Sequence, residues 1–349
     1  MRLSLIVVLF LSLLGLVSCT SEFDVNSDWT PIPVVYCVLD QSQATQYVKV
    51  TKAFLGDAPA YVMAQYSDSL FYNDVEVRLY EKNSTGRQLV ATFDETNNIP
   101  MDTGYFASDR NTLYTSDVTL NPEKEYFLDV QINDIGKTVT NDDPVSLIEN
   151  CYIATPSVQQ AFINIYSYDN NSSYEYYTGT NGKVYQMIIK FYYLEVIGTD
   201  TTENALCIEW PQAVKVDSLS NTNNKVRGEF SVSAWYNLLK ESIPTQPNVK
   251  RLVRMPVSIE YHLVGADENY YTYMQISSPS TGLAQSKPLF TNLSGGIGLF
   301  AARVNTVVAK KLGERTLDSL SFGMYMYDKG FALHTDPYYQ PHFPLPGSK

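Results

Sequence analysis

The chain has 349 residues, of which 44% are hydrophobic and 18% are charged, and its formal net charge is −12. This apolar share rules out a disordered chain, and the length allows one large domain or two of ordinary size. The acidic balance argues against a nucleic-acid-binding protein and against a peripheral protein held to anionic lipid by charge. Seventeen Pro and 18 Gly in a chain rich in Tyr, Val and Thr favour a mainly β fold.

Residues 1–18 have the pattern of a secretory signal peptide. Arg2 precedes an apolar run, Leu3–Leu14, which is too short for a comfortable membrane span and is followed by small residues. The sequence Leu-Val-Ser-Cys at 16–19 resembles the lipobox of bacterial lipoproteins, in which the cysteine is acylated and becomes the first mature residue. The alternative is an ordinary signal peptide that happens to end at a cysteine. We expect lipidation of Cys19, with diacylglycerol and palmitate-type acyl chains as the membrane anchor.

Residues 19–30 are polar and acidic and are expected to form a short tether. Removal of the signal peptide, which holds one cation and no acid, changes the net charge from −12 to −13. Acidic residues directly after the lipidated cysteine resemble the surface-export signal of Bacteroidetes lipoproteins. The expected location is therefore the outer membrane, with the cell surface favoured over the periplasmic face.

Residues 31–148 alternate short β patterns with turn signals, which predicts an immunoglobulin/fibronectin III-like β-sandwich. Alternation through Val75–Phe93 predicts a hairpin. The segment Leu120–Tyr126 resembles the tyrosine corner of fibronectin type III domains, so the Tyr126 hydroxyl should bond to upstream backbone. The alternative is an ordinary strand entry with a chance tyrosine. Residues 55–73 fit no alternating strand and are expected to form a short helix or a flap.

Residues 149–333 predict a larger antiparallel β domain with two or three short helices. Long strands are expected at Val184–Ile197, Ala205–Val216 and Leu252–Val264. Helices are expected near 231–242 and 267–277, where apolar residues recur at helical spacing behind capping residues.

The segment from Asn292 to Phe300 holds three glycines in four positions, but it lacks the Lys and Ser/Thr of a phosphate-binding loop. A strand-like run, Ile297–Val308, follows it, so a turn with a β-bulge is the favoured interpretation. The tail, 334–349, holds four prolines and is expected to run extended over the surface.

Several of these patterns together resemble a family of uncharacterised Bacteroidetes lipoproteins defined only as a domain of unknown function. They are the lipobox at Cys19, the strands Pro33–Asp40 and Val75–Glu81, the strand and helix at Val257–Gln275, and Asn292-x-x-Gly295-Gly296-x-Gly298-x-Phe300. Members are often encoded beside TonB-dependent receptors, so the resemblance implies such a receptor, or another outer-membrane protein, as a partner. The family carries no known catalytic residues, and none is transferred.

Motifs that would specify a chemistry are missing from the sequence. There is no HExxH, no GxSxG and no metal-type Cys/His spacing, so we expect no metal, no cofactor and no catalytic residue. His262 lies in a strand, and His334 and His342 lie in the tail. Cys37, Cys151 and Cys207 allow at most one intramolecular disulfide.

Tyrosine is the conspicuous residue, with 27 copies. Five of them lie among Asn, Ser, Gly and Asp, where turns should form, and exposed aromatic rings beside amides suit a sugar-binding loop. The alternative is a tyrosine-rich loop that covers the edge of its own domain. The five residues are Tyr166, Tyr168, Tyr174, Tyr176 and Tyr177.

Four tripeptides resemble the Bacteroidetes O-glycosylation signal, Asp followed by Ser or Thr and then an apolar residue or Thr. Their acceptor residues are Ser69, Thr201, Ser218 and Ser319. The alternative is that these are unmodified loop residues.

Three functions follow from these observations. The favoured one is a non-catalytic binding or accessory lipoprotein of the outer membrane that works beside a TonB-dependent receptor, with a glycan as a further candidate ligand. The second is a structural or adhesive surface lipoprotein with protein partners. The third is a glycan-active hydrolase whose carboxylates lie far apart in the sequence.

Overall fold

The computed structural model describes residues 31–53, 60–102, 104, 106–198, 200–201, 205–218, 223–278 and 289–344. The signal peptide, Cys19 and the acidic tether lie outside these residues. Within the described ranges no helix is long and apolar enough to cross a membrane.

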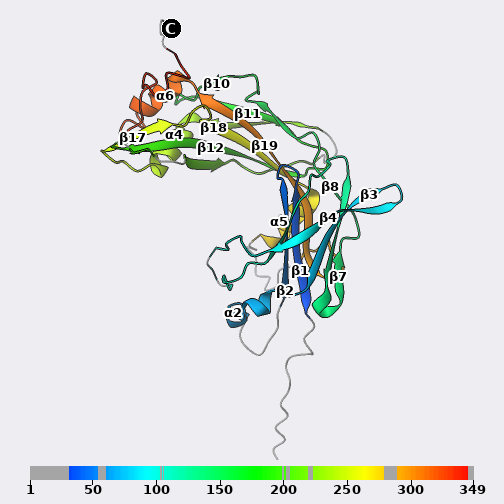
Figure 1. Ribbon diagram of the computed structural model, residues 1–349. Coiled ribbons are helices and arrows are strands. Elements are labelled where there is room, and N and C mark those ends of the chain that lie inside the picture. Colours follow the sequence, from blue (N-terminus) through cyan, green and yellow to red (C-terminus); the bar gives the residue numbers. More distant parts are fainter. Residues whose placement is uncertain are drawn as a thin grey trace, which may run out of the picture.

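The lower lobe in Figure 1 is a β-sandwich. Its elements are β1 (Ile32–Asp40), β2 (Thr45–Ala53), α2 (Ala60–Met63), α3 (Ser67–Leu70), β3 (Val75–Asn83), β4 (Gly86–Thr96), β5 (Leu113–Asp117), β6 (Glu125–Ile132), η1 (Asn133–Ile135), β7 (Lys137–Thr140) and β8 (Val145–Ser146). The layer of β1, β2 and β5 packs on the layer of β3, β6 and β7, and β4 pairs with both β5 and β3. Alternate residues such as Val35 of β1 and Val130 of β6 fill the core between the layers. The predicted hairpin at 75–93 is confirmed as β3 and β4.

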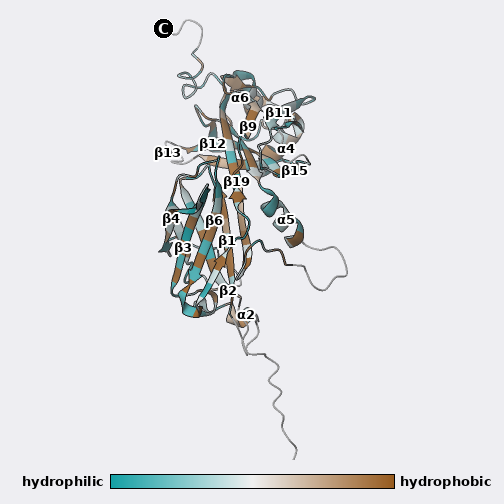
Figure 2. Ribbon diagram, turned by 90° about the vertical axis from the view of Figure 1, so that its right-hand side faces the viewer, coloured by the Kyte–Doolittle hydropathy of each residue, from teal (hydrophilic) through white to brown (hydrophobic). Residues whose placement is uncertain are grey.

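The elements of the upper lobe are β9 (Tyr152–Thr155), β10 (Phe162–Ile163), β11 (Asn171–Tyr177), β12 (Val184–Ile197), β13 (Asp200–Thr201), β14 (Leu206–Pro211), β15 (Lys215–Val216), β16 (Lys225–Ser231), α4 (Val232–Ser242), β17 (Val249–Val253), β18 (Ile259–Ala266), α5 (Glu268–Ser277), β19 (Ile297–Leu312) and α6 (Glu314–Phe322). Strands β14, β12, β18 and β19 form its main sheet, and β16, β11 and β9 form a second sheet. The two sheets, α4 and α6 enclose a core that includes Phe191, Trp235 and Tyr261. Figure 2 shows the strands of both lobes carrying hydrophobic and hydrophilic residues in alternation, as half-buried strands should.

The mainly β, antiparallel architecture with short helices is confirmed. Both predicted upper-lobe helices are also confirmed, as α4 and α5. Ser231 caps α4 by accepting from the Ala234 N–H at 3.4 Å, and Asp267 caps α5 by accepting from the Tyr270 N–H at 2.9 Å. These side chains satisfy backbone donors that the first helical turn leaves unpaired.

The sandwich is completed by a strand from the far end of the chain. The first half of β19 lies parallel to β1, with Val34 opposite Ile297 and Asp40 opposite Arg303. Its second half pairs with β18 in the upper lobe. The division predicted between residues 148 and 149 is therefore crossed by β19, which belongs to both lobes. A parallel partner arrives through a long crossover, so local patterns do not assign it.

Two side chains just before the glycines, those of Thr291 and Asn292, bond to the edge of β19 that faces away from β1. The Asn292 side chain donates to the Phe300 carbonyl at 2.6 Å and accepts from the Phe300 N–H at 2.9 Å. The Thr291 hydroxyl accepts from the Gly298 N–H at 3.2 Å. Because β18 pairs with β19 only from Arg303 onward, these side chains replace a missing strand along this edge.

Two long strands predicted in the upper lobe are each divided. The first, Ala205–Val216, is two strands, β14 and β15, and the second, Leu252–Val264, is β17 and β18. In the second case Pro256 lies at the break, and proline has no N–H to donate to a neighbouring strand. The hydrophobic pattern alone does not reveal this interruption.

The prediction of an extended surface tail is wrong for the described part of the tail. Residues 335–343 form turns, and Tyr339 is fully buried. Its hydroxyl accepts from the Val253 N–H at 2.7 Å, and Phe343 is 8% exposed. The aromatic residues between the prolines hold the tail against the core, and their burial outweighs the tendency of proline to keep a chain extended.

The hydrogen bond expected of Tyr126 is present. Its buried hydroxyl accepts from the Asn121 N–H at 2.7 Å and lies 3.2 Å from the Asn121 carbonyl, to which it donates. The ring packs in the core of the sandwich. The likeness of the whole sandwich to fibronectin type III domains stays a prediction.

We expect Tyr126→Phe to lower the free energy of unfolding by about 1–3 kcal/mol, because it removes both hydrogen bonds between the buried Tyr126 hydroxyl and the backbone of Asn121. Tyr72→Phe is the matched control, since the buried Tyr72 hydroxyl has no hydrogen-bond partner among the described residues and its loss should cost nothing. Urea unfolding of both variants measures the difference. Equal effects of the two substitutions would contradict the role given to the Tyr126 hydrogen bonds.

Candidate functional site

The predicted sugar-binding loop is not formed. Its centre is strand β11, whose alternation points Tyr174 and Tyr176 into the core, where they are 4% and 1% exposed. The ring of Tyr168 packs edge-on against Tyr236. The Tyr166 hydroxyl accepts from Arg315 at 2.8 Å, and Tyr177 stacks on Tyr152. The polar neighbours of these tyrosines indicated turns, but strand alternation and burial of the aromatic rings decided the conformation.

The four predicted glycosylation acceptors lie in different places. Ser69 and Ser319 are half-buried within α3 and α6, and the Ser319 hydroxyl donates to the Arg315 carbonyl at 2.9 Å. Ser218 is exposed after β15. The backbone of Thr201 lies in β13, and its side chain is outside the described part of the structure. Modification stays a prediction, and Ser218 has the accessibility that it requires.

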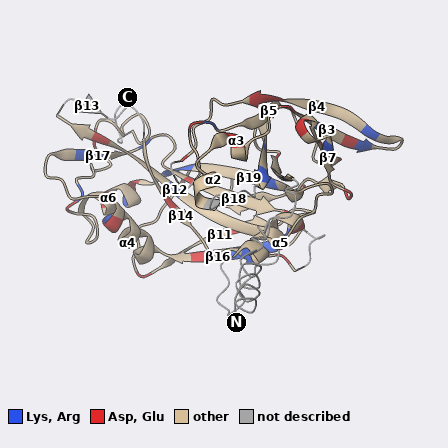
Figure 3. Cartoon of the chain, turned by 90° about the horizontal axis from the view of Figure 1, so that it is seen from below, with Lys and Arg blue, Asp and Glu red and all other residues tan. Residues whose placement is uncertain are grey.

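One face of the upper sheet carries a set of interacting polar side chains. We define the open face by the half-buried or exposed residues that alternate with the core residues: Gln186, Ile188, Lys190 and Tyr192 of β12, Glu260, His262 and Val264 of β18, and Asn305 and Val307 of β19. The strand register places Lys190 opposite Glu260 and Ile188 opposite His262. Figure 3 shows these strands from below, side by side, with α5 beside them.

Glu260 is the centre of the hydrogen bonds on the open face. It accepts from the Tyr192 hydroxyl at 2.8 Å, contacts His262 Nε2 at 2.9 Å and pairs with Arg254 at 3.3 Å. The Arg254 guanidinium also lies 3.7 Å above the centre of the Tyr192 ring. Each charged group on this part of the face therefore has a fixed partner.

These partners determine the protonation states. Burial acts to raise the pKa of Glu260, but hydrogen bonds from His262 and Tyr192 and the charge of Arg254 more than offset it, so the net pKa is lowered. The Asn305 amide nitrogen lies 3.3 Å from His262 Nδ1. Because the amide donates, Nδ1 accepts. Nε2 then carries the hydrogen, and it donates a hydrogen bond to Glu260. The open face thus presents an ionised carboxylate beside an oriented imidazole.

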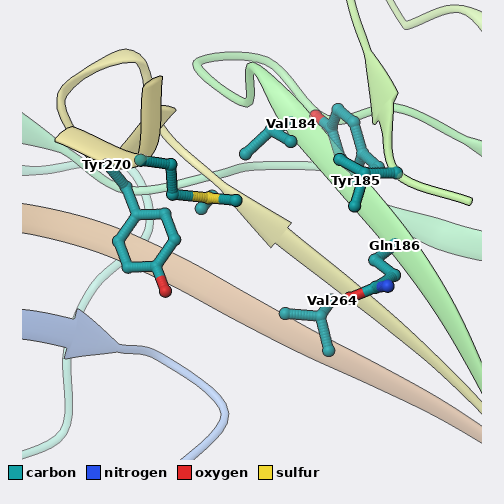
Figure 4. Close-up of a pocket in the computed structure, with 8 residues that line it drawn as sticks. Val184, Tyr185, Gln186, Val264 and Tyr270 are labelled. Carbon is teal, nitrogen blue, oxygen red and sulfur yellow. The ribbon is translucent and has the colours of Figure 1, made fainter. Parts of the chain in front are cut away.

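An apolar pocket lies at the other end of the same face. It has a volume of about 120 Å³ and is lined by Val184, Tyr185, Gln186, Val214, Val264, Ala266, Tyr270 and Met274. Figure 4 shows Tyr270, which belongs to α5, facing Val264 and Val184 of the sheet. Gln186 and Val264 are register partners, and Ile188 and His262 form the next pair along the same face, so the pocket and the polar network are neighbours.

Cys207 is a nucleophilic side chain beside the network. It is the register partner of Tyr192 and is exposed, but desolvation raises the pKa of its thiol, and the Tyr192 hydroxyl offsets this only in part. A thiol nucleophile requires a lowered pKa and a free base. His262 does not supply the base, because both of its ring nitrogens are already hydrogen-bonded.

Within the described ranges no group of three His, Cys, Asp or Glu is placed to hold a metal ion. The geometry suits reversible binding through hydrogen bonds and apolar contact.

The sequence places His262 and Glu260 on the same side of a strand, but it does not indicate Tyr192, Lys190 or Asn305 as their neighbours. The sequence feature that could have indicated the network is the presence of polar residues at alternate positions of β12, β18 and β19, which are otherwise apolar. Only the register between β12, β18 and β19 brings these positions together.

We expect Glu260→Gln to destabilise the protein by about 1–3 kcal/mol at neutral pH, because the amide cannot accept from all three partners. The pKa of Glu260 is lowered from 4.5 on folding, so its stabilising contribution is present above that value and is lost as the pH falls below it. The difference in urea midpoint between wild type and variant should therefore shrink with falling pH. Glu209→Gln, which changes the exposed partner of Lys190, should cost less than about 1 kcal/mol. A difference that is independent of pH would contradict an ionised Glu260.

A family model described as a domain of unknown function (DUF4249) matches residues 20–307. No curated protein matches the chain. The matched range includes the sandwich, the strands of the open face as far as Val307, and α5.

Proposed function

This chain belongs to the DUF4249 family, a domain of unknown function, and from that premise we propose that it is a non-catalytic, lipid-anchored binding protein of the outer membrane. The open face of the upper sheet is the binding surface. One observation carries the proposal: a half-exposed sheet face holds an ionised Glu260, an oriented His262 and an apolar pocket in one row.

The composition of the open face supports binding of a protein partner. Apolar surface bordered by hydrogen-bonding groups is the common form of a protein–protein interface, which has an apolar centre and a polar rim. On β19, Val307 is 44% exposed opposite His262, so apolar surface continues past the polar network. The preformed hydrogen bonds reduce the entropy lost when a partner docks.

The partner that we propose is a TonB-dependent receptor or another outer-membrane protein. This proposal rests on the family resemblance and on the lipobox at Cys19, which would hold the chain at the same membrane as such a receptor. Cell-surface display is favoured by the acidic residues that follow Cys19.

Affinity purification from native membranes tests the binding surface. Val307→Glu should reduce the recovered partner by about tenfold, because it buries a charge in the interface. Val158→Glu is the matched control, since Val158 is 71% exposed in the same lobe but is not part of the open face. Loss of the partner with Val158→Glu and its retention with Val307→Glu would exclude the open face as the binding surface.

The anchor is tested separately. Cys19→Ala should move the protein from the membrane fraction to the soluble fraction, because the acyl chains supply its attachment. Mass spectrometry of the mature wild-type chain should show the added lipid. If the variant stays with membranes after a high-salt wash, attachment does not depend on Cys19.

A further inference from the structure

The lower end of the sandwich carries a small folded projection, which we call the foot: α2, α3 and residues 106–110. Ile32 at the start of β1 is opposite Ala53 at the end of β2, so the chain enters the fold at the same end from which it continues to the foot. Figure 1 shows α2 at this end and the upper lobe at the opposite end. The foot therefore lies where the tether from Cys19 joins the fold.

The foot has its own small core. Leu70, Phe71 and Ala107 are buried together, and the Ala107 N–H donates to the Ala64 carbonyl at 2.7 Å. These contacts join residues 106–110 to the two short helices. The backbone that carries the outward side chains of the foot is therefore held together.

Three aromatic side chains of the foot point away from this core. Tyr61 and Tyr66 are 68% and 61% exposed, and Phe106 is 57% exposed. Exposure of three large aromatic side chains on so small an element is costly in water. Tyrosine is enriched at membrane–water interfaces, because its ring enters the apolar region while its hydroxyl stays in the headgroup layer.

The length of the tether places a bilayer within reach of the foot. Cys19 precedes Pro31 by 12 residues, which span at most about 40 Å when fully extended. A lipidated Cys19 would therefore keep the end of the sandwich that carries the foot close to the membrane surface. The exposed aromatic residues of α6 and the turn after it lie in the other lobe.

The charges of the foot favour an uncharged lipid surface. Asp68 is exposed, and Asp109 accepts from the Ser67 hydroxyl. The cations of this region have partners: the Lys52 amine donates to the Asp68 carbonyl at 3.1 Å and lies 5.0 Å from the Tyr72 ring, and the Arg110 guanidinium donates to the Thr112 hydroxyl at 2.8 Å and pairs with Glu95 at 3.8 Å. Anionic lipid attracts clusters of outward-facing cations, and the described foot presents carboxylates beside its aromatic rings.

We propose that the foot rests on the zwitterionic lipid surface of the membrane that anchors the chain, with Tyr61, Tyr66 and Phe106 inserted at headgroup depth. The inference rests on the lipid anchoring proposed above. The acyl chains supply the membrane affinity, and the foot fixes the orientation, so that the upper lobe and its open face point away from the bilayer. A contact with a tethered chain needs little affinity of its own, because the tether makes its formation intramolecular.

Hydrogen–deuterium exchange tests the contact. The full lipidated chain on phosphatidylcholine vesicles is compared with the soluble Cys19→Ala chain. Amides in residues 60–70 and 106–110 should exchange at least about tenfold more slowly on vesicles, because bilayer contact opposes local opening. Residues 322–333 of the upper lobe should exchange equally in both.

Two lipidated variants separate the foot from other exposed aromatic residues. Tyr61→Ser/Tyr66→Ser/Phe106→Ser should lose the protection of the foot while remaining bound to vesicles. Phe322→Ser/Met324→Ser/Tyr327→Ser changes side chains that are 65–69% exposed in the upper lobe and should retain it.

Three outcomes would overturn the proposal. Equal exchange of the foot in vesicle-bound lipidated chain and in soluble chain would remove the foot contact but leave the anchor intact. Protection in the soluble chain that rises with protein concentration would assign the foot to a contact between two copies. A mature chain without lipid by mass would contradict the anchor, and the orientation that depends on it, together.

Discussion

Gly298→Ala is expected to disrupt the pairing of β1 with β19 and to destabilise the protein by at least about 3 kcal/mol. Gly298 has a φ of +132°, which L side chains rarely adopt, and an added Cβ would lie 1.9 Å from the Val35 carbonyl oxygen. Val35 is fully buried in a strand that is paired on both sides, so its backbone cannot move away. The measurement is the urea midpoint, followed by circular dichroism and intrinsic fluorescence.

Gly86→Ala separates backbone strain from the steric clash. Gly86 has a φ of +139°, similar to that of Gly298, but no atom lies within 4 Å of its added Cβ. Its substitution should cost only the strain of a positive φ, about 1–3 kcal/mol. If the two variants are equally stable, close approach of β1 is not the reason for glycine at 298.

The effect of Gly298→Ala should extend to both lobes. The first half of β19 belongs to the sandwich and the second half to the upper sheet, within one strand. Trp210 and Trp235 lie in the upper lobe, whereas Gly298 lies in the half of β19 that belongs to the sandwich. Their fluorescence therefore reports on the lobe that does not contain the substitution. Their fluorescence should change at the same urea concentration as the far-ultraviolet signal of the whole protein, because the strand links the two cores.

Arg251→Ala is the second substitution with a large expected effect, about 3–5 kcal/mol of lost stability. The Arg251 side chain is fully buried and pairs with Glu195 at 2.7 Å. Its guanidinium also donates to the Lys329 carbonyl at 2.6 Å and to Gln246 Oε1 at 2.9 Å. Truncation would leave a carboxylate and two acceptors without this donor in a place that water reaches poorly. Urea unfolding measures the loss.

Two comparisons test this explanation. Arg227→Ala removes an exposed arginine that pairs with Glu229 at 2.8 Å and should cost less than about 1 kcal/mol. Arg251→Lys keeps the charge but cannot donate in the three directions of a guanidinium, so it should recover only part of the stability. Full recovery with lysine would show that charge alone, without the hydrogen-bond geometry, stabilises this site.

Elements whose cause is local follow from the amino-acid pattern alone. Strand β12 is predicted with its observed bounds, Val184–Ile197, because a long Tyr-rich run that is apolar on both faces is typical of a central strand. Helices α4 and α5 follow from apolar spacing and from the caps Ser231 and Asp267, which act within one helical turn. The hydrogen bond of Tyr126 to Asn121 is also local, since five residues separate its partners.

Features that depend on contacts between distant segments follow only from the packing of the whole fold. The pairing of Val34 with Ile297 joins residues 263 positions apart, and no local pattern encodes that choice. Tyr176 and Tyr339 are buried because their rings pack in the core of the upper lobe, although the residues next to them in sequence are typical of turns or tails. The open face arose in the same way, because the register of β12 against β18 and β19 brought Tyr192 and Asn305 to Glu260 and His262. Propensity and capping act over a few residues, whereas register and burial are set by the free energy of the whole core.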